Sequence, residues 1–289
     1  MKFFIVDAFT DSVFGGNPAG VVILPDGEDF PSEEICIKTA AELRYSETAF
    51  IKKVGKNEFN IRYFTPAAEV DLCGHATIAS FYCLAQTGEI ENNALCINHT
   101  LAGDLNIEVK DGFIMMDMAS PVLIDTIKDS EKLKELYNVM GAEVPENLEI
   151  LPQLVSTGLP DIMLPLPSKE ILDAINPDMK KLSDLSKAYN VTGVHAYALA
   201  SCDATCYCRN FAPLYDIDEE AATGTSNGAL TYHLFLNNII SGKSQCKMIQ
   251  GEAMGRPSAI LTVLDADEES CKIKVGGSGV ILAEGDIRI

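Results

Sequence analysis

One short stretch decides the fold: Asp71-Leu72-Cys73-Gly74-His75-Ala76-Thr77. It follows a β-branched and aromatic run at residues 61–65, which predicts a strand, and it precedes an apolar helical pattern that ends at Gly88. The stretch therefore marks the start of a buried helix. Because the first N–H groups of a helix have no partner within it, such a start is suited to bind an anion.

A second glycine-led helix start, Gly224-Thr225-Ser226-Asn227, lies 150 residues further on, ahead of an apolar helical pattern up to Leu236. Each start follows a strand-rich segment and precedes a hairpin, at residues 105–118 around Asp111-Gly112 and at residues 259–275. This repeated order predicts a duplicated half-domain. The alternative is a chance likeness within an α+β protein.

The remaining segments complete two halves. Strands at residues 3–9 and 21–24 flank the turn signal Gly15-Gly16-Asn17-Pro18 and are expected to pair, a helix is expected at 32–44, and a strand at 45–51. Later in the chain we expect a helix from about Ser130 to Gly141 and strands at 154–164, 194–200 and 206–211.

We place the domain boundary near residue 120. This gives an N-terminal half, 1–120, and a C-terminal half, 121–289, whose last strand, about 278–289, is expected to pack back on the N-terminal half. At 289 residues the chain has ample length for two cores.

Composition excludes several classes of protein. A net charge of −20 disfavours a nucleic-acid partner, and no apolar run reaches the roughly 18 residues that a membrane helix needs. The acidic Asp7 interrupts what would have to be the apolar part of an export signal. Nine cysteines without a small-domain pattern fit reduced thiols, so we expect a cytoplasmic protein.

Glu47 is the first candidate catalytic residue. Strand alternation over residues 45–51 places it on a largely apolar face, where desolvation raises the pKa of a carboxyl toward neutrality and lets it take and return a proton. The alternative is a solvated glutamate on an edge strand, and the pattern alone does not decide between them.

The two helix starts supply the other candidates. Gly74 allows a ligand to approach the backbone, and His75 can donate a hydrogen bond or carry a proton, although Asp71 can equally be a helix cap and His75 a structural residue. In the second start, Glu220 precedes Gly224 and Thr225. Acidic residues in that position can also be simple partners of the helix dipole.

Other sites are not expected. Cys202, Cys206 and Cys208 alternate along one segment, which suits tetrahedral zinc poorly, so no metal site is predicted. A two-thiol mechanism is disfavoured because the second helix start has no counterpart of Cys73. The phosphate-binding glycine motifs are missing, so no cofactor is implied. His99, His195 and His233 lack triad partners and are expected to be structural.

Five segments together resemble the PhzF-like family of phenazine-biosynthesis isomerases. They are Gly16-Asn17-Pro18-Ala19, Ser46-Glu47-Thr48-Ala49-Phe50, Asp71 to Thr77, Ala222-Thr223-Gly224, and Gln250-Gly251 with Gly255-Arg256-Pro257. The resemblance implies an α+β, diaminopimelate-epimerase-like fold with two pseudo-symmetric halves, each a curved sheet around a central helix. It also implies a site in the cleft between the halves and a homodimer.

The resemblance assigns proton transfer to Glu47 and places Gly74 and His75 in the site. We expect His75 and Glu220 to assist catalysis, and Asn17, Asp71, Gly74, Gly224 and Thr225 to bind the substrate. Glu220 and Thr225 stand where the family has Asp and Ser, so the family's named reaction is not transferred to this chain.

The expected function is cofactor-independent isomerisation of a small anionic or carboxylate-bearing substrate by proton transfer. Two alternatives remain open: an amino-acid or hydroxy-acid epimerase, and a catalytically silent protein that binds small molecules.

Overall fold

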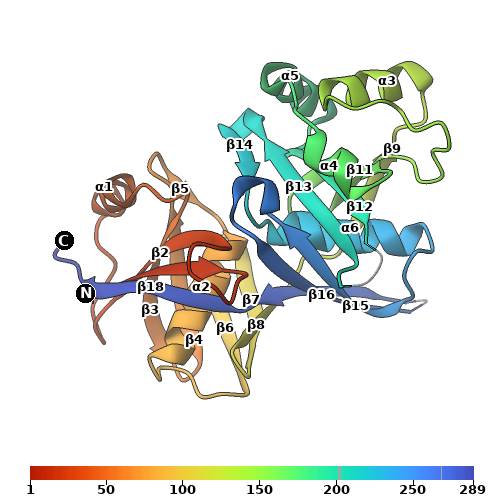
Figure 1. Ribbon diagram of the computed structural model, residues 1–289. Coiled ribbons are helices and arrows are strands. Elements are labelled where there is room, and N and C mark those ends of the chain that lie inside the picture. Colours follow the sequence, from red (N-terminus) through yellow and green to blue (C-terminus); the bar gives the residue numbers. More distant parts are fainter. Residues whose placement is uncertain (201–202, 268) are drawn as a thin grey trace. The chain divides into compact units, whose positions relative to one another are not determined.

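The computed structural model describes residues 1–200, 203–267 and 269–289. The chain forms two compact units, one of residues 1–117 with 276–289 and one of residues 118–275. Each unit combines strands with helices, which confirms the α+β class (Figure 1).

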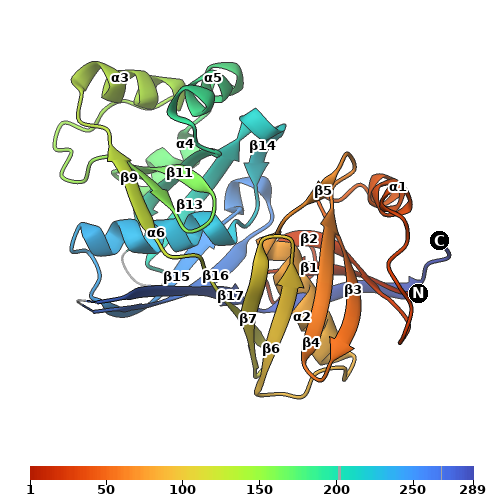
Figure 2. The same cartoon turned by 180° about the vertical axis from the view of Figure 1, so that it is seen from behind.

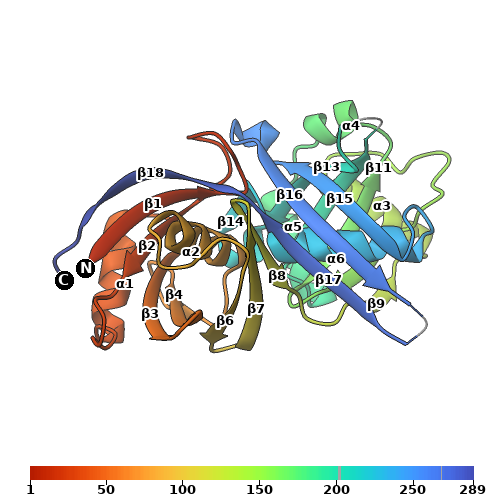
Figure 3. The same cartoon turned by 90° about the horizontal axis from the view of Figure 1, so that it is seen from below.

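The first unit is a curved sheet around one helix. Its strands are β1 (Lys2–Ala8), β2 (Asn17–Ile23), β3 (Thr48–Gly55), β4 (Glu58–Phe64), β5 (Glu69–Val70), β6 (Ala94–Thr100), β7 (Gly103–Lys110), β8 (Phe113–Asp117) and β18 (Gly279–Asp286). Helix α2 (Gly74–Gln86) contacts β1, β2, β3, β7, β8 and β18, and Figure 3 shows the sheet bending around it. Helix α2, which begins within the stretch from Asp71 to Thr77, is therefore the centre of this unit.

Helix α2 is apolar almost all round because it lies in this core. Nine of its residues are buried, among them Ile78, Phe81 and Leu84. The shorter helix α1 (Glu33–Leu43) begins at the N-cap Ser32, whose hydroxyl accepts from the N–H of Ile35, as the sequence predicted. It packs Cys36 and Ala40 against the sheet.

The second unit repeats the plan with additional helices. Its strands are β9 (Val122–Thr126), β10 (Gln153–Ser156), β11 (Pro160–Leu166), β12 (Gly193–Leu199), β13 (Cys206–Ala212), β14 (Ile217–Glu220), β15 (Lys243–Gln250), β16 (Ser258–Ala266) and β17 (Cys271–Gly277). Its helices are α3 (Ser130–Val139), α4 (Lys169–Ala174), α5 (Met179–Tyr189) and α6 (Gly224–Leu236). Helix α6 contacts β10, β11 and β16 (Figure 2).

Strand pairing reveals the duplication directly. In the first unit β2 runs parallel to β3, β3 antiparallel to β4, β4 parallel to β6, and β6 antiparallel to β7. In the second unit β11, β12, β13, β15 and β16 pair in the same sequence of directions. Helices α2 and α6 both span 13 residues and occupy the same place in this order. A chance likeness does not produce the same succession of strand directions around two helices of equal length, so the pseudo-symmetric fold is confirmed.

Strand β18 closes the first unit from the far end of the chain. It pairs antiparallel with β1 over its length, from Lys2 opposite Asp286 to Ala8 opposite Gly279, with one irregularity after Ile5. β1 thereby has a partner on both edges, since β2 pairs with its other side as predicted.

Several predicted boundaries were wrong. Asn17 and Pro18 belong to β2 rather than to a turn, and residues 45–47 precede β3 instead of lying in it. The single strand expected at 154–164 is a hairpin of β10 and β11, because Gly158 at φ 145° allows the chain to reverse there. Helices α4 and α5 were not predicted.

Candidate active site

The start of helix α2 lacks a side-chain cap. Its N-cap is Cys73 in an extended conformation, and no side chain caps it. The predicted alternative role of Asp71 as a cap is therefore wrong: Asp71 is exposed, two residues before the N-cap. Gly74 is the first helical residue and is partly exposed, so a ligand can approach the backbone at this point.

A directed chain of buried hydrogen bonds holds this helix start in place. The Asn98 amide donates to the Tyr63 hydroxyl (2.8 Å), which lies 2.7 Å from Thr77 Oγ1, and Thr77 in turn donates to the Cys73 carbonyl (2.7 Å). Because the Thr77 hydroxyl donates its proton to the Cys73 carbonyl, the Tyr63 hydroxyl must donate to Thr77 Oγ1. These hydrogen bonds hold the backbone of the N-cap residue, Cys73, in place.

Glu47 reaches this helix start from the loop between α1 and β3. The sequence placed it on a strand face, and that placement was wrong, but its side chain is nonetheless only 15% exposed. The burial comes from contact with α2 rather than from strand alternation. Its Oε2 lies 3.2 Å from His75 Nε2 and is buried without a hydrogen bond.

His75 is the centre of the cluster. It is 5% exposed, and Nε2 lies 3.3 Å from Ser46 Oγ as well as 3.2 Å from Glu47. Its Nδ1 faces the Cys73 sulfur at 3.4 Å. The structure thus brings together four residues quoted from two separate motifs, Ser46 and Glu47 from one and Cys73 and His75 from the other. A carboxylate, an imidazole and a thiol at one helix start can accept, donate and pass on a proton.

Asn17 lies elsewhere in the same unit. It is the first residue of β2, pairs in register with Ala8 and is 6% exposed. The bend before it is made by Gly16, at φ 62°, where an added Cβ would lie 2.1 Å from the Ala8 carbonyl oxygen. Its predicted role in substrate binding is not decided by these contacts.

The second helix start, at α6, has a comparable arrangement. Glu220 ends β14, and its Oε2 accepts from the hydroxyl of Thr223, the N-cap, at 2.9 Å. The amide of Gln250 donates to the Glu220 carbonyl at 2.8 Å and accepts from the Thr223 N–H at 3.3 Å. Gln250 belongs to one of the quoted motifs, and its contacts show that it braces this loop. Gly224 is buried and Thr225 partly exposed.

A buried polar network continues below α6 and was missed from the sequence. Asn227 donates to Gln250 Oε1 at 2.8 Å, and its own Oδ1 lies 3.3 Å from His195 Nε2. Asn210 lies between His195 Nδ1 and Ser226 Oγ, at 3.2 and 3.1 Å, and Ser226 donates to Asp161. No single motif signals this set, because its members come from four strands and one helix.

Two titratable groups in this network are strongly affected by burial. Desolvation raises the pKa of Asp161 to about 6 and lowers that of His195 to about 4. His195 is therefore neutral near pH 7, with Nε2 donating to Asn227 and Nδ1 accepting from Asn210. His233, hydrogen-bonded to Tyr197 at 2.9 Å, is likewise neutral, since burial lowers its pKa to about 4.

The remaining sequence expectations concern thiols and membranes. Cys206 and Cys208 are buried in β13, where desolvation raises the pKa of both thiols above the usual range, and Cys202 lies outside the described residues. Within the described ranges, no helix combines the length and apolar character needed to cross a membrane.

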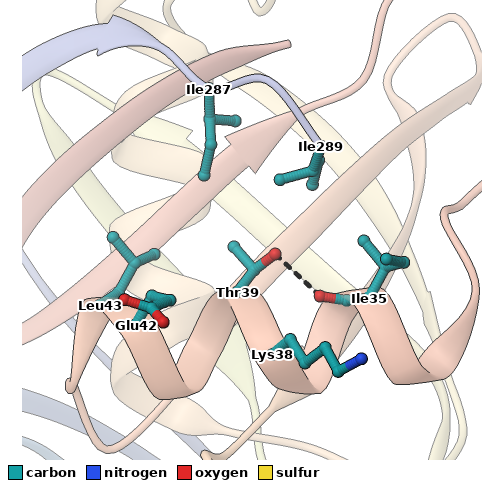
Figure 4. A pocket seen from close by; sticks show the side chains of 7 residues that line it. All are labelled: Ile35, Lys38, Thr39, Glu42, Leu43, Ile287 and Ile289. Atoms are coloured by element: carbon teal, nitrogen blue, oxygen red, sulfur yellow. Dashed lines mark hydrogen bonds between the residues drawn. The ribbon is translucent and has the colours of Figure 1, made fainter.

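The clearest cavities do not coincide with these residues. One, of about 330 Å³, lies between α1 and the C-terminal residues Ile287 and Ile289 (Figure 4). Its lining combines four aliphatic side chains with Lys38, Thr39 and Glu42, and it includes none of the predicted site residues. A second, of about 410 Å³, lies beside residues 145–150 in the second unit. We therefore locate the candidate site by its chemistry rather than by cavity size.

Comparison with known proteins identifies the family. Residues 6–285 match the family model described as phenazine biosynthesis-like protein. An uncharacterized isomerase of Clostridium acetobutylicum is 33% identical, covering 98% of this chain and 96% of its own length. The trans-2,3-dihydro-3-hydroxyanthranilate isomerase of Pseudomonas fluorescens is 27% identical, with 99% of both chains covered.

Solved structures agree at the level of the fold. A PhzF-family phenazine biosynthesis protein of Bacillus anthracis aligns with a TM-score of 0.87 at 26% identity, covering 100% of this chain and 99% of its own. A hydroxyproline epimerase of Agrobacterium vitis aligns with a TM-score of 0.67 at 12% identity, covering 99% and 90%, and shares the fold alone. The chain therefore belongs to the phenazine biosynthesis-like, or PhzF, family of isomerases, as the motifs in its sequence indicated.

Proposed function

We propose that this isomerase moves a proton between carbon atoms of a small carboxylate-bearing substrate, with Glu47 as the group that takes and returns the proton. The observation that carries the proposal is the Glu47 carboxylate itself. One of its oxygens is buried without a hydrogen bond, 3.2 Å from His75 Nε2. An unsatisfied buried acceptor is costly, and a substrate proton would satisfy it.

The surrounding groups fit defined roles in this reaction. The start of α2, which no side chain caps, suits a substrate carboxylate or a developing enolate, because backbone N–H groups at a helix N-terminus attract negative charge. His75 can donate from Nε2 to the same charge or hold Glu47 in position, and Ser46 is within reach of that nitrogen. This chemistry needs only a base, donors and a desolvated carboxylate, so we propose that it proceeds without a cofactor.

The second helix start, at α6, also belongs to the proposed site. Glu220, Gly224 and Thr225 are predicted to act on the same substrate, by resemblance to the family. Thr223 already donates to Glu220, so the carboxylate is oriented before any ligand arrives. A Glu220→Gln variant tests this prediction separately from the role of Glu47.

The test is deuterium incorporation from heavy water into a panel of cyclic and acyclic amino and hydroxy acids that includes dihydro-hydroxyanthranilate. It is read by mass spectrometry, with chelator present and no cofactor added. We expect wild type and the exposed control Glu91→Gln to exchange, and Glu47→Gln to lose at least about 100-fold, the usual lower contribution of a general acid or base.

Each other outcome has a defined meaning. Near-wild-type exchange by Glu47→Gln would disprove the role of Glu47. Exchange at a stereocentre that yields both configurations would identify an epimerase instead. Binding of cyclic carboxylates without any exchange would favour the silent binding protein.

A further inference from the structure

The cluster at the start of α2 has a second chemical capacity, which is metal binding. Glu47, Cys73 and His75 each offer one ligand atom, and all three atoms lie within 4.8 Å of one another. A carboxylate oxygen, a thiolate sulfur and an imidazole nitrogen are the three kinds of ligand that zinc takes from proteins. Three protein ligands also leave a fourth position open for water or a substrate oxygen.

The distances lie near those of a tetrahedral ion. With bonds of about 2.0–2.3 Å, neighbouring ligand atoms around zinc lie about 3.3–3.7 Å apart. His75 Nε2 is 3.2 Å from Glu47 Oε2 and 3.9 Å from Cys73 Sγ. Both distances fall just outside that range, and Cys73 Sγ lies nearer to His75 Nδ1, at 3.4 Å, so rotation of the Cys73 and His75 side chains is needed to bring the three atoms around one ion.

Burial and hydrogen bonding point the same way. Cys73 and His75 are 8% and 5% exposed, and Glu47 is 15% exposed. The Glu47 oxygen that faces the cluster lacks a hydrogen bond, so no existing bond has to be broken for it to coordinate an ion. Cys73 is the N-cap of α2 and lies two residues before His75, so both ligands are carried by the same helix start.

We propose that Glu47, Cys73 and His75 bind a thiophilic divalent cation such as Zn²⁺ or Cd²⁺, and that the bound ion inhibits the isomerase reversibly. Binding replaces the thiol proton of Cys73, which is released to solvent, and takes up the lone pair of Glu47. The carboxylate can then no longer accept a proton from the substrate. The inhibition rests on the proposed function of Glu47, whereas metal binding does not.

The sequence did not reveal this site because its ligands come from two elements. Glu47 lies in the loop before β3, and Cys73 and His75 open α2, 26 and 28 residues later. Searches for metal motifs rely on short ligand spacings, and a spacing of two between a cysteine and a histidine is uninformative alone.

Binding is measured first, on the full chain. Cd²⁺ is titrated while the ultraviolet charge-transfer absorption of the cadmium–thiolate bond is followed, and Zn²⁺ affinity is measured by competition with a chromophoric chelator. The matched control is Cys271→Ser, because Cys271 is the more exposed thiol and lies outside the cluster. We expect wild type and Cys271→Ser to bind one equivalent alike, with Cys73→Ser losing the absorption.

Two further variants guard against a folding defect in Cys73→Ser. His75→Gln and Glu47→Gln should each weaken Zn²⁺ binding at least tenfold, since even groups that only orient a metal ligand are worth about 10–100-fold in affinity. Wild-type affinity in both variants, or full cadmium–thiolate absorption in a folded Cys73→Ser, would overturn the site.

Inhibition is measured next, by deuterium exchange with and without Zn²⁺. We expect loss of exchange in wild type and in Cys271→Ser, and recovery on addition of chelator. Metal binding together with normal exchange in Glu47→Gln would refute the proposed function and leave the metal site standing. Glu47-dependent exchange that Zn²⁺ does not affect, with no metal bound, would refute the metal site alone.

Discussion

Asp161→Asn tests whether the network under α6 contains a proton taken up on folding. Asp161 is 2% exposed, and burial raises its pKa from 3.8 to about 6. The folded protein therefore holds this proton more tightly than the unfolded chain does. As the pH rises from about 4 to about 6, Asp161 loses its proton first in the unfolded chain. The contribution of Asp161 to the free energy of unfolding therefore falls across this window and is lowest above it.

The size of the effect follows from the two pKa values. At about 1.36 kcal/mol per pH unit, a change from 3.8 to about 6 corresponds to about 3 kcal/mol over the whole window. About half of it, roughly 1.4 kcal/mol, falls between pH 5 and pH 7.5. Asparagine cannot ionise. When the pH is raised from 5 to 7.5, the free energy of unfolding of the variant relative to wild type should therefore increase by roughly 1.4 kcal/mol.

Urea unfolding followed by circular dichroism, at about pH 5 and about pH 7.5, measures that difference. Other groups titrate equally in both proteins and cancel, and His195, whose pKa is lowered to about 4, is neutral in the folded state throughout. The exposed substitution Asp184→Asn, which likewise removes one carboxylate, is measured alongside as the control. A difference for Asp161→Asn that is the same at both pH values would refute the reasoning.

Two stability predictions follow from contacts near the helix starts. Tyr63→Phe removes the hydroxyl that links Asn98 to Thr77 and should cost about 1–3 kcal/mol in urea unfolding, whereas Tyr215→Phe, on a 61% exposed side chain, should cost nearly nothing. Gly193→Ala places a Cβ 1.8 Å from the Phe211 carbonyl oxygen and should lower stability by about 1–3 kcal/mol or more, whereas Gly285→Ala, with nothing within 4 Å, should be neutral. If the two variants of either pair changed the free energy of unfolding equally, the packing described here would be contradicted.

The elements that the sequence predicted well are those set by local signals. Ser32 caps α1 as expected, and Asp111-Gly112 turns the hairpin of β7 and β8. The two glycine-led helix starts fell at Gly74 and Gly224 because each follows a strand and opens an apolar helix. Here the local preference and the tertiary structure agree.

The errors have physical causes. The apolar run at 154–164 reads as one strand, but Gly158 reverses it, and the period of the pattern does not show a reversal. Helices α4 and α5 begin at the caps Ser168 and Asp178, signals present in the sequence and overlooked. The strand alternation expected around Glu47 is absent because this residue precedes β3, and its contact with His75, 28 residues further on, follows from no local pattern.

The network around Asp161 could not be predicted at all. Asp161 and Ser226, its hydrogen-bond partner, lie 65 residues apart, and His195 lies 32 residues from Asn227. Their proximity depends on the register of the strands that carry them, which single-sequence patterns do not specify.

The return of β18 to β1 has a consequence for synthesis of the protein. Translation delivers residues 1–117 long before residues 276–289, yet β1 needs both neighbours, and the Met1 amino group also donates to the Ile287 carbonyl at 3.2 Å. While the chain is still on the ribosome, one edge of β1 stays open. A chain that stopped between residue 117 and the start of β18 at Gly279 would keep that edge of β1 exposed, and an unpaired strand edge can pair with another chain and aggregate.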